Sequence, residues 1–226
     1  MLKDFKTTYL DKQTICEDTV SFNFEKPAHF EYQSGQFIEL FLEHNPGVAY
    51  PFTLSSFPGE PYLTITTRMW SQSKFKIWLE TLVPGQMVTM TGPWGNFVLE
   101  EGTENLSIFL AGGIGITPFR SMVKEAIDSE KNLPSSIFHS NKFSRTTPFK
   151  KEFEALLNRG VQLYYLMTQE GSERLSFAYI NSKENITRDS RFYISGAPVF
   201  IDTLADDLVA NGIQEKMIRV DSFSGY

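Results

Sequence analysis

Three glycines within four positions follow a short apolar segment. Residues 107–111 are Ser-Ile-Phe-Leu-Ala, and Gly112, Gly113 and Gly115 come directly after them. A short apolar run that is cut off by glycine predicts a buried strand. Because glycine has no Cβ, it lets the backbone turn tightly and approach a ligand closely. These residue types would suit a site for an anionic phosphate group.

Ile116, Thr117 and Pro118 complete this motif. Threonine is a favoured N-cap and proline a favoured first helical residue, so we expect a helix from Pro118. The free N–H groups at its start would attract a dinucleotide pyrophosphate. Pro118 stands where the Rossmann fingerprint has its third glycine, so the motif alone leaves open an ordinary turn between a strand and a helix.

A second polar segment follows the next predicted strand, Ser135–His139. Ser140, Asn141 and Lys142 lie where a dinucleotide-binding sheet would place the ribose. An acid in this place selects NAD, whereas cations and hydroxyl groups accommodate the 2′-phosphate of NADP. The loop adds Arg145 and no acid, which favours NADPH over NADH. A solvated basic loop would have the same residues.

The sequence contains few candidates for other chemistry. Cys16 is the single cysteine, which excludes an intramolecular disulfide and a four-cysteine iron–sulfur cluster. His29, His44 and His139 have no metal-ligand spacing, which argues against a zinc site. Redox chemistry would therefore need a bound organic cofactor.

The composition is that of an ordinary globular protein. The chain has 226 residues, of which 41% are hydrophobic and 21% charged, and its net charge is -6 at pH 7. A negative net charge gives no general attraction to nucleic acid or anionic lipid. The first residues lack the apolar core of a signal peptide, and no stretch has the roughly 18 apolar residues of a membrane span. We expect a cytoplasmic protein with no nucleic-acid partner and no membrane span.

The first hundred residues have the pattern of short strands separated by turns, with His-Asn-Pro-Gly at 44–47 and Phe-Pro-Gly-Glu-Pro at 57–61 taken as turns. One helix is expected at Ser73–Leu82, capped by Ser73. Six strands at this spacing predict a small antiparallel β-barrel. The strands are expected at Phe5–Ile15, Thr19–Glu25, Gln36–Leu42, Pro51–Ser55, Tyr62–Arg68 and Met87–Thr91.

After about residue 102, strand and helix patterns alternate, which predicts a parallel sheet covered by helices. The strands are expected at Leu106–Ala111, Ser135–His139, Gln162–Met167, Arg191–Ser195 and Lys216–Val220, and the helices at Pro118–Ser129, Pro148–Asn158, Ser176–Asn181 and Val199–Ala210. We therefore expect two domains, 1–102 and 103–226. Ligands of such sheets bind beyond the carboxyl ends of the strands.

Six short motifs together resemble one family. In chain order they are Gln36-Phe37, Pro51–Ser56, Gly92–Phe97, Gly112–Pro118, Ser195–Pro198 and Phe223–Tyr226. Their order is similar to that of the ferredoxin–NADP reductase superfamily, and within it to stand-alone bacterial oxidoreductases. The resemblance covers nearly the whole chain. It implies a flavin-binding six-stranded antiparallel β-barrel followed by an α/β nucleotide-binding domain, with FAD and NADPH or NADH as cofactors.

The resemblance gives roles to residues 50–53. Phe52 would pack against the flavin ring, and Thr53 would hydrogen-bond flavin N5, because a hydroxyl can donate or accept. Without the resemblance, the two residues would be a core and an exposed position on a strand. The family usually has an arginine two residues before this aromatic, to pair with the flavin phosphate, and this chain has Tyr50 beside Pro51. Tyr50 would stack on the cofactor or mark weak binding, with FAD and FMN both open.

The segment from Thr67 to Lys76 resembles the family's second phosphate-binding segment. Arg68 and Lys76 are candidate replacements for the missing arginine. Ser73 would cap the helix that carries Phe75 and Lys76, and its first N–H groups would approach the pyrophosphate. A surface helix with solvated lysines is the alternative. Gly92–Phe97 would support the flavin site or form a hairpin turn with core aromatics.

The last candidates come from the end of the chain. Ser195-Gly196 stands where the family commonly has Cys-Gly, with the cysteine close to nicotinamide C4. Asp221 resembles an acid that is often found nearby in the family. Tyr226 looks like the C-terminal aromatic that closes over the flavin, although a frayed terminus is the alternative.

Three functions remain open at this stage. The resemblance implies hydride transfer from NAD(P)H to FAD, with electrons passed to a protein carrier, such as an iron–sulfur protein, or to a small acceptor. A second hypothesis is a flavin or ferric-complex reductase that uses flavin as a loosely bound substrate, because Tyr50 replaces the arginine. The third is a non-catalytic subunit that senses redox state or nucleotides.

Overall fold

The computed structural model describes residues 4–42, 45–69, 73–100 and 107–223. These form two compact units. The first, here called the barrel unit, contains Met1–Leu99 and Thr117–Ser129. The second, the sheet unit, contains Glu100–Ile116 and Glu130–Gly225. The predicted domain ranges 1–102 and 103–226 remain a prediction. The segment 112–116 is called the glycine turn below, and the helix that follows it is grouped with the barrel unit.

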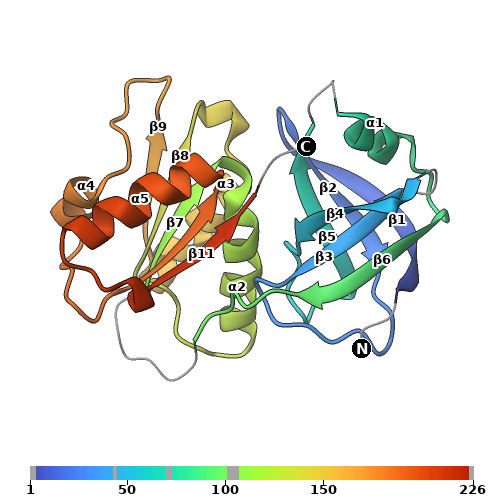
Figure 1. Ribbon diagram of the computed structural model, residues 1–226, viewed down its shortest axis with the longest axis horizontal. Helices are drawn as coiled ribbons and strands as arrows, with labels where there is room; N and C mark the ends of the chain where they lie inside the picture. Colours follow the sequence, from blue (N-terminus) through green and yellow to red (C-terminus); the bar gives the residue numbers. More distant parts are fainter. Residues whose placement is uncertain (1–3, 43–44, 70–72, 101–106, 224–226) are drawn as a thin grey trace. The chain divides into compact units, whose positions relative to one another are not determined.

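The barrel unit contains a six-stranded antiparallel sheet in the order β4-β3-β6-β1-β2-β5, which confirms the predicted strands (Figure 1). Its outer strands meet at an isolated bridge between Leu54 and Ile65, beside a hydrogen bond from the Ser55 N–H to the Thr64 carbonyl at 2.9 Å. The strands are β1 (Phe5–Cys16), β2 (Thr19–Glu25), β3 (Phe37–Leu42), β4 (Asn45–Thr53), β5 (Tyr62–Arg68) and β6 (Met87–Trp94).

The predicted turn at 44–47 was wrong from Asn45 onward, because a strand runs through it. β4 already begins at Asn45 and includes Pro46. Proline has no N–H for a strand partner, and it is accepted here because β4 is an outer strand of the sheet. β6 continues through Gly92-Pro93 to Trp94, which pairs with Phe37 of β3. Gly92–Trp94 is therefore strand, which speaks against the alternative of a hairpin turn in this part of Gly92–Phe97, and support of the flavin site stays a prediction.

The helix of the barrel unit, α1 (Lys74–Thr81), has the predicted cap. The Ser73 hydroxyl accepts a hydrogen bond from the Lys76 N–H at 3.4 Å. Phe75 and Leu79 are buried on one side of the helix, against core side chains from the alternating inner positions of the strands. The sequence pattern of alternating apolar residues therefore gives both the strands and the core.

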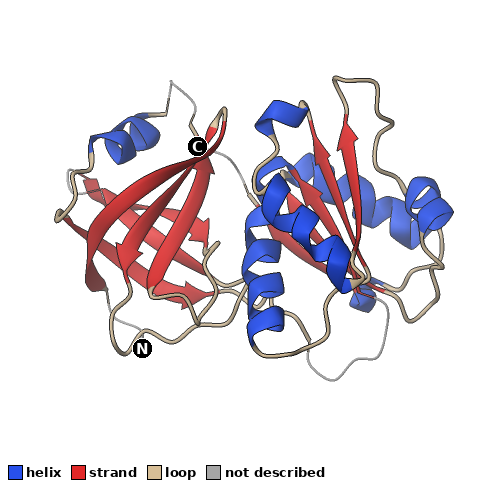
Figure 2. Ribbon diagram, turned by 180° about the vertical axis from the view of Figure 1, so that it is seen from behind, coloured by secondary structure: helices blue, strands red, loops and turns tan. Residues whose placement is uncertain are grey.

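The sheet unit contains a five-stranded parallel sheet in the order β11-β10-β7-β8-β9, with helices beside it, as predicted (Figure 2). Side chains of α4 and α5 share one hydrophobic core with β7, β8 and β10. The strands are β7 (Ser107–Gly112), β8 (Ser136–Asn141), β9 (Gln162–Met167), β10 (Arg191–Gly196) and β11 (Ile218–Ser222), and the helices are α3 (Lys150–Glu154), α4 (Phe177–Lys183) and α5 (Pro198–Ala210). Helix α2 (Thr117–Asp128) follows β7 in the chain and is grouped with the barrel unit.

The predicted helix at Pro148–Asn158 is shorter in the structure. Phe149 has a φ of 57°, so α3 begins only at Lys150. After Glu154 the helix tightens into a 3₁₀ segment, Ala155–Arg159. Within the described ranges, no helix has the length and apolar character needed to cross a membrane.

Candidate cofactor sites

The glycine turn lies where the strand order of the sheet reverses. After β7 the chain builds β8 and β9 on one side of it, and then β10 and β11 on the other. Ala111 of β7 is beside Ser195 of β10, and Gly112 is beside Ser140 of β8. Such a switch point opens a crevice beyond the carboxyl ends of the strands, where nucleotides bind. The fold thus places the predicted motif at the carboxyl ends of the strands, where a nucleotide-binding motif is expected.

The turn rests directly on the end of β10. A Cβ on Gly115 would lie 2.2 Å from the Ser195 carbonyl oxygen and 2.8 Å from the Gly196 nitrogen. A Cβ on Gly112 or Gly196 would lie 2.8 Å or 3.0 Å from the Phe200 ring. Real Cβ atoms do not come this close to backbone atoms, so Gly115 is required for space. The structure therefore brings Gly112, Gly115, Ser195 and Gly196 together.

The helical part of the motif begins earlier than expected. Gly113–Ile116 forms a 3₁₀ turn that continues into α2, so Thr117 is the first residue of α2 and not its cap. Ile116, Thr117 and Pro118 are buried. The first N–H groups of a helical run have no partners within the run. Because this run begins at Gly113, these free N–H groups are those of Gly113–Ile116. They are the donors that a pyrophosphate would use.

Sequence analysis missed His139, which supports this turn. The ring is 2% exposed, and its Nε2 lies 2.8 Å from the Gly113 carbonyl oxygen and 2.8 Å from the Asn141 amide. In the Nε2–H tautomer the ring donates to the Gly113 carbonyl, and in the other tautomer Nε2 accepts from the Asn141 Nδ2. His139 thereby ties β8 to the glycine turn. A single histidine within an apolar strand gave no signal for this role.

The predicted ribose residues lie at the end of β8 and in the loop after it, and an acid from the segment after β9 lies beside them. Lys142 and Arg145 are exposed, and the Arg145 guanidinium lies 4.3 Å from the centre of the Phe143 ring. The Glu170 carboxylate accepts hydrogen bonds from the backbone N–H and the hydroxyl of Ser144, at 2.9 and 3.1 Å. Folding thus supplies the acid that the loop itself lacks.

The end of β10 carries the predicted nicotinamide residues. Ser195 is fully buried, and its hydroxyl has no hydrogen-bond partner within the described part of the chain. Asp221 of β11 is its register neighbour, so the two side chains share one face of the sheet. The Phe223 N–H donates to the Gly196 carbonyl at 2.9 Å. Tyr226 lies outside the described residues, so its role as a gate stays a prediction.

On the flavin side, the predicted aromatic residues are part of the barrel core. Tyr50 and Phe52, two positions apart on β4, both stack on Phe75 of α1, with ring centres 4.0 and 5.4 Å apart. Phe52 is 7% exposed, and Thr53 is buried at the end of β4. Contact of Phe52 and Thr53 with a flavin ring therefore remains a prediction. Pro51, between Tyr50 and Phe52, is exposed.

Two cations meet beside these aromatics. Lys76 is 4% exposed, and no acidic side chain among the described residues pairs with it. Burial, and then the positive charge of Arg68, lower the Lys76 pKa from its usual 10.5 to about 8. Arg68 ends β5 and forms an ion pair with Asp18 at 3.4 Å. Lys76 at the start of a capped helix, with the charge of Arg68 acting on it, forms an environment that fits the pyrophosphate of FAD.

Lys76→Met is expected to weaken FAD binding to the apo-protein by about 10- to 100-fold at pH 7, because a charged hydrogen bond to phosphate contributes about 1.5–3 kcal/mol. The wild-type association constant should be level below pH 8 and fall above it, where Lys76 of the apo-protein loses its proton. The methionine variant should lack this fall. Titration followed by flavin fluorescence measures both effects.

Lys74→Met, which removes an exposed lysine from the same helix, is the matched control. It should change neither the affinity for FAD nor its pH dependence. The Lys76→Met apo-protein should also unfold at a higher temperature, because the low pKa means that the charged lysine opposes folding below pH 8. Equal FAD affinity of the two variants would contradict this role of Lys76.

The antiparallel barrel with its cationic pair and the parallel sheet with its glycine turn define a class of protein, the two-domain oxidoreductases that bind a flavin and a nicotinamide nucleotide. Residues 6–99 match the oxidoreductase FAD-binding domain, and residues 109–206 match the oxidoreductase NAD-binding domain. The two matches follow each other over most of the chain. The chain belongs to the ferredoxin–NADP reductase superfamily.

Similar proteins agree with this assignment. The glycine betaine monooxygenase reductase subunit of Chromohalobacter salexigens is 31% identical over 66% of this chain and 40% of its own length. The propane 2-monooxygenase reductase component of Mycolicibacterium goodii is 21% identical over 99% of this chain and 68% of its own length. A ferredoxin NADP+ reductase of Neisseria gonorrhoeae, solved with bound FAD and NADP, has the same fold, with a TM-score of 0.84, 17% identity and coverage of 97% of this chain and 98% of that one. This chain thus spans about 40% of the first of these curated relatives.

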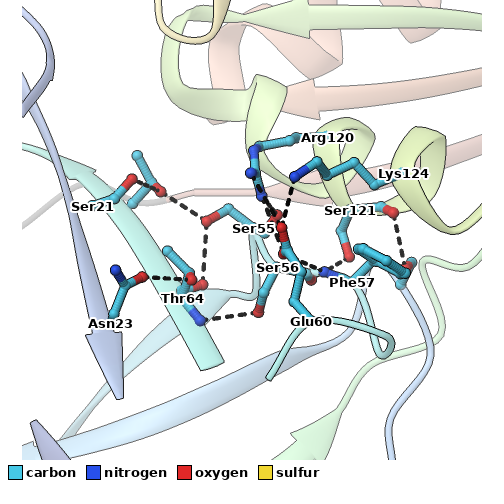
Figure 3. A network of polar contacts seen from close by, with 12 residues as sticks. Ser21, Asn23, Ser55, Ser56, Phe57, Glu60, Thr64, Arg120, Ser121 and Lys124 are labelled. Atoms are coloured by element: carbon cyan, nitrogen blue, oxygen red, sulfur yellow. Dashed lines mark hydrogen bonds and ion pairs between the residues drawn. The ribbon is translucent and has the colours of Figure 1, made fainter. Parts of the chain in front are cut away.

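A separate polar network fixes α2 within the barrel unit (Figure 3). The Glu60 carboxylate, 10% exposed, accepts hydrogen bonds from Lys124 at 2.6 Å and from Arg120 at 3.4 Å. Arg120 also donates to the Ser55 carbonyl at 2.6 Å, and the Ser121 hydroxyl donates to the Ser56 carbonyl. The helix that follows the glycine turn is thus held by the segment that follows Thr53.

Proposed function

We propose that this chain is an NAD(P)H-dependent flavoprotein reductase that passes electrons to a separate redox protein. The observation that carries this proposal is the glycine turn, which leaves no room for a side chain at Gly115 against the Ser195 carbonyl. A backbone turn of this kind at a switch point suits close approach of a pyrophosphate. The cationic pair Arg68 and Lys76 supports a second, flavin site on the same chain.

The residues would mainly bind and orient the two cofactors. The N–H groups of Gly113–Ile116 would hold the nicotinamide pyrophosphate, and Lys76 with Arg68 would hold that of FAD. The bound flavin supplies the redox chemistry, by accepting a hydride from NAD(P)H and releasing electrons singly or in pairs. Thr53 and Ser195 would contribute hydroxyl groups at the two reacting rings. No strong base or nucleophile is needed for this chemistry.

The electron acceptor is proposed to be an oxygenase component or a small redox protein. The names of two relatives, a glycine betaine monooxygenase reductase subunit and a propane 2-monooxygenase reductase component, support an oxygenase partner. Both relatives are longer than this chain, so the acceptor is proposed only as a class. A cytoplasmic location stays a prediction from the sequence.

The spectrum of the purified protein tests this proposal. It should contain bound FAD, and the flavin absorbance should disappear on anaerobic addition of NADH or NADPH and return with a one-electron acceptor. Failure of both nucleotides to react, with or without added FAD, would overturn the proposal. If the flavin is reduced, the rate at which candidate oxygenase components reoxidise it would identify the acceptor.

The second candidate function is a reductase of free flavin, favoured by Tyr50. The ring of Tyr50 stacks on Phe75 where the family resemblance implies an arginine that pairs with phosphate. Loss of this clamp would weaken FAD binding by about 1.5–3 kcal/mol if Lys76 and Arg68 did not replace it. A colourless protein that oxidises NAD(P)H only in proportion to added flavin would support this function instead.

A further inference from the structure

Backbone hydrogen bonds place the segment before Glu170 beside the loop after β8, and the exposed Glu170 carboxylate reaches that loop. Beyond the ends of β8 and β9 the two chains continue side by side, because the N–H groups of Thr168 and Gln169 donate to the carbonyls of Asn141 and Lys142, at 2.9 and 3.0 Å. The next residue is Glu170. Its position beside the β8 loop therefore follows from the sheet itself and not from a chance side-chain rotamer.

One carboxylate oxygen of Glu170 takes up two donors of that loop. Oε1 accepts from the Ser144 N–H at 2.9 Å and from the Ser144 hydroxyl at 3.1 Å. These are the neutral donors that a 2′-phosphate would need in this loop. An anion at this place would have to compete with the carboxylate for them and to approach a like charge.

The β8 loop lies on the adenosine side of the proposed nucleotide site. Ser140 is the register neighbour of Gly112, and His139 contacts the Gly113 carbonyl at 2.8 Å. A dinucleotide whose pyrophosphate lies at the turn after the first strand reaches the end of the second strand with its adenosine ribose. In this sheet the first and second strands are β7 and β8.

We propose that Glu170 is a specificity-determining residue that makes this protein prefer NADH to NADPH. The inference rests on the proposed function, because it concerns the same nucleotide site. The 2′-hydroxyl of NADH can donate to the carboxylate, whereas the 2′-phosphate of NADPH is repelled by it and finds the Ser144 donors occupied. Ser144 and Glu170 thus form a ribose-binding pair.

The cations that favoured NADPH at the sequence level do not outweigh this pair. Lys142 and Arg145 are exposed, so salt and water screen their charges. The Arg145 guanidinium also lies over the Phe143 ring, at 4.3 Å. Glu170 is exposed as well, but its carboxylate is fixed at the loop by both Ser144 donors.

Binding of two redox-inactive fragments tests the proposal. The FAD-loaded full chain is titrated calorimetrically with ADP-ribose and with its 2′-phosphate, which contain the pyrophosphate and adenosine but no nicotinamide. The wild type should bind ADP-ribose at least about tenfold more tightly, a difference of about 1.4 kcal/mol. Glu170→Gln should bring the two affinities within about threefold of each other by strengthening the binding of the phosphorylated compound.

Glu173→Gln, which removes the same charge at an exposed position three residues away, should keep the wild-type ratio. The proposal is overturned if the wild type binds the phosphorylated fragment equally well or better, if Glu170→Gln leaves the ratio unchanged, or if Glu173→Gln changes it as much. If neither fragment binds and neither NADH nor NADPH reduces the flavin, the proposed function itself fails. Reduction of the flavin by both nucleotides at equal efficiency would refute only the role of Glu170.

Discussion

Replacement of Gly115 by alanine is expected to abolish reduction of the flavin by NAD(P)H while FAD binding is retained. The added Cβ would lie 2.2 Å from the Ser195 carbonyl oxygen and 2.5 Å from its carbonyl carbon, both backbone atoms at the end of β10. Neither atom can rotate away, so the glycine turn must move by about an ångström. A misplacement of that size costs about 100-fold in a reaction that depends on positioning.

The measurement is anaerobic flavin reduction in a stopped-flow instrument, together with calorimetric binding of ADP-ribose. Both should be lost in Gly115→Ala, and the absorbance of bound FAD should remain because the candidate flavin residues belong to the barrel unit. Overpacking should also lower the free energy of unfolding by about 1–3 kcal/mol.

Gly212→Ala separates loss of stability from loss of the site. A Cβ on Gly212 would meet nothing within 4 Å, but its φ of 92° disfavours alanine, so the variant should lose about 1 kcal/mol of stability. It should still bind ADP-ribose and reduce the flavin. If Gly115→Ala reacted at a rate similar to Gly212→Ala, the glycine turn would not be the nucleotide site.

The fold could be predicted well because its signals are local. Alternating apolar residues predict the strands of the barrel, and a serine before an amphipathic segment predicts the start of α1. The errors occur where position in the sheet overrides residue type. Pro46 lies within β4 because β4 is an outer strand, and no local pattern shows which strands are outermost.

The candidate site could be predicted only where it is contiguous in the sequence. The glycine turn is such a motif, and the structure places it at the switch point of the sheet. His139 and Glu170 act on residues 26 positions away, Gly113 and Ser144, so their roles depend on strand order and register. A histidine within an apolar strand and an acid in a polar turn have no distinctive pattern.

Glu60 also has a role that no local sequence pattern shows, because its partners lie 60 and 64 positions further along the chain. At the sequence level it was one residue of a Phe-Pro-Gly-Glu-Pro turn. In the structure its carboxylate meets Arg120 and Lys124, and it also accepts a hydrogen bond from the Phe57 N–H at 3.1 Å. One buried acid thus compensates two cations of α2 and fixes its own turn.

Glu60→Ala is expected to destabilise the barrel unit by about 3–5 kcal/mol, because it removes the buried carboxylate that Arg120 and Lys124 share. Lys124→Met should cost about 1 kcal/mol or less, since Arg120 and Glu60 remain a matched pair and the Lys124 side chain is 32% exposed. Glu31→Ala, which removes an exposed acid, is the control. Urea unfolding followed by fluorescence gives the three values.

Hydrogen exchange then shows whether the loss is local to α2. Without Glu60, the hydrogen bonds that remain to α2 include those of Arg120 and Ser121 to the Ser55 and Ser56 carbonyls and those from Ser34. The α2 amides should therefore exchange faster, while those of β1 and β2 follow global unfolding. Because α2 continues directly from the glycine turn, its release would also free one end of that turn, and ADP-ribose should bind more weakly. Unchanged α2 protection in Glu60→Ala would show that Glu60 does not hold the helix.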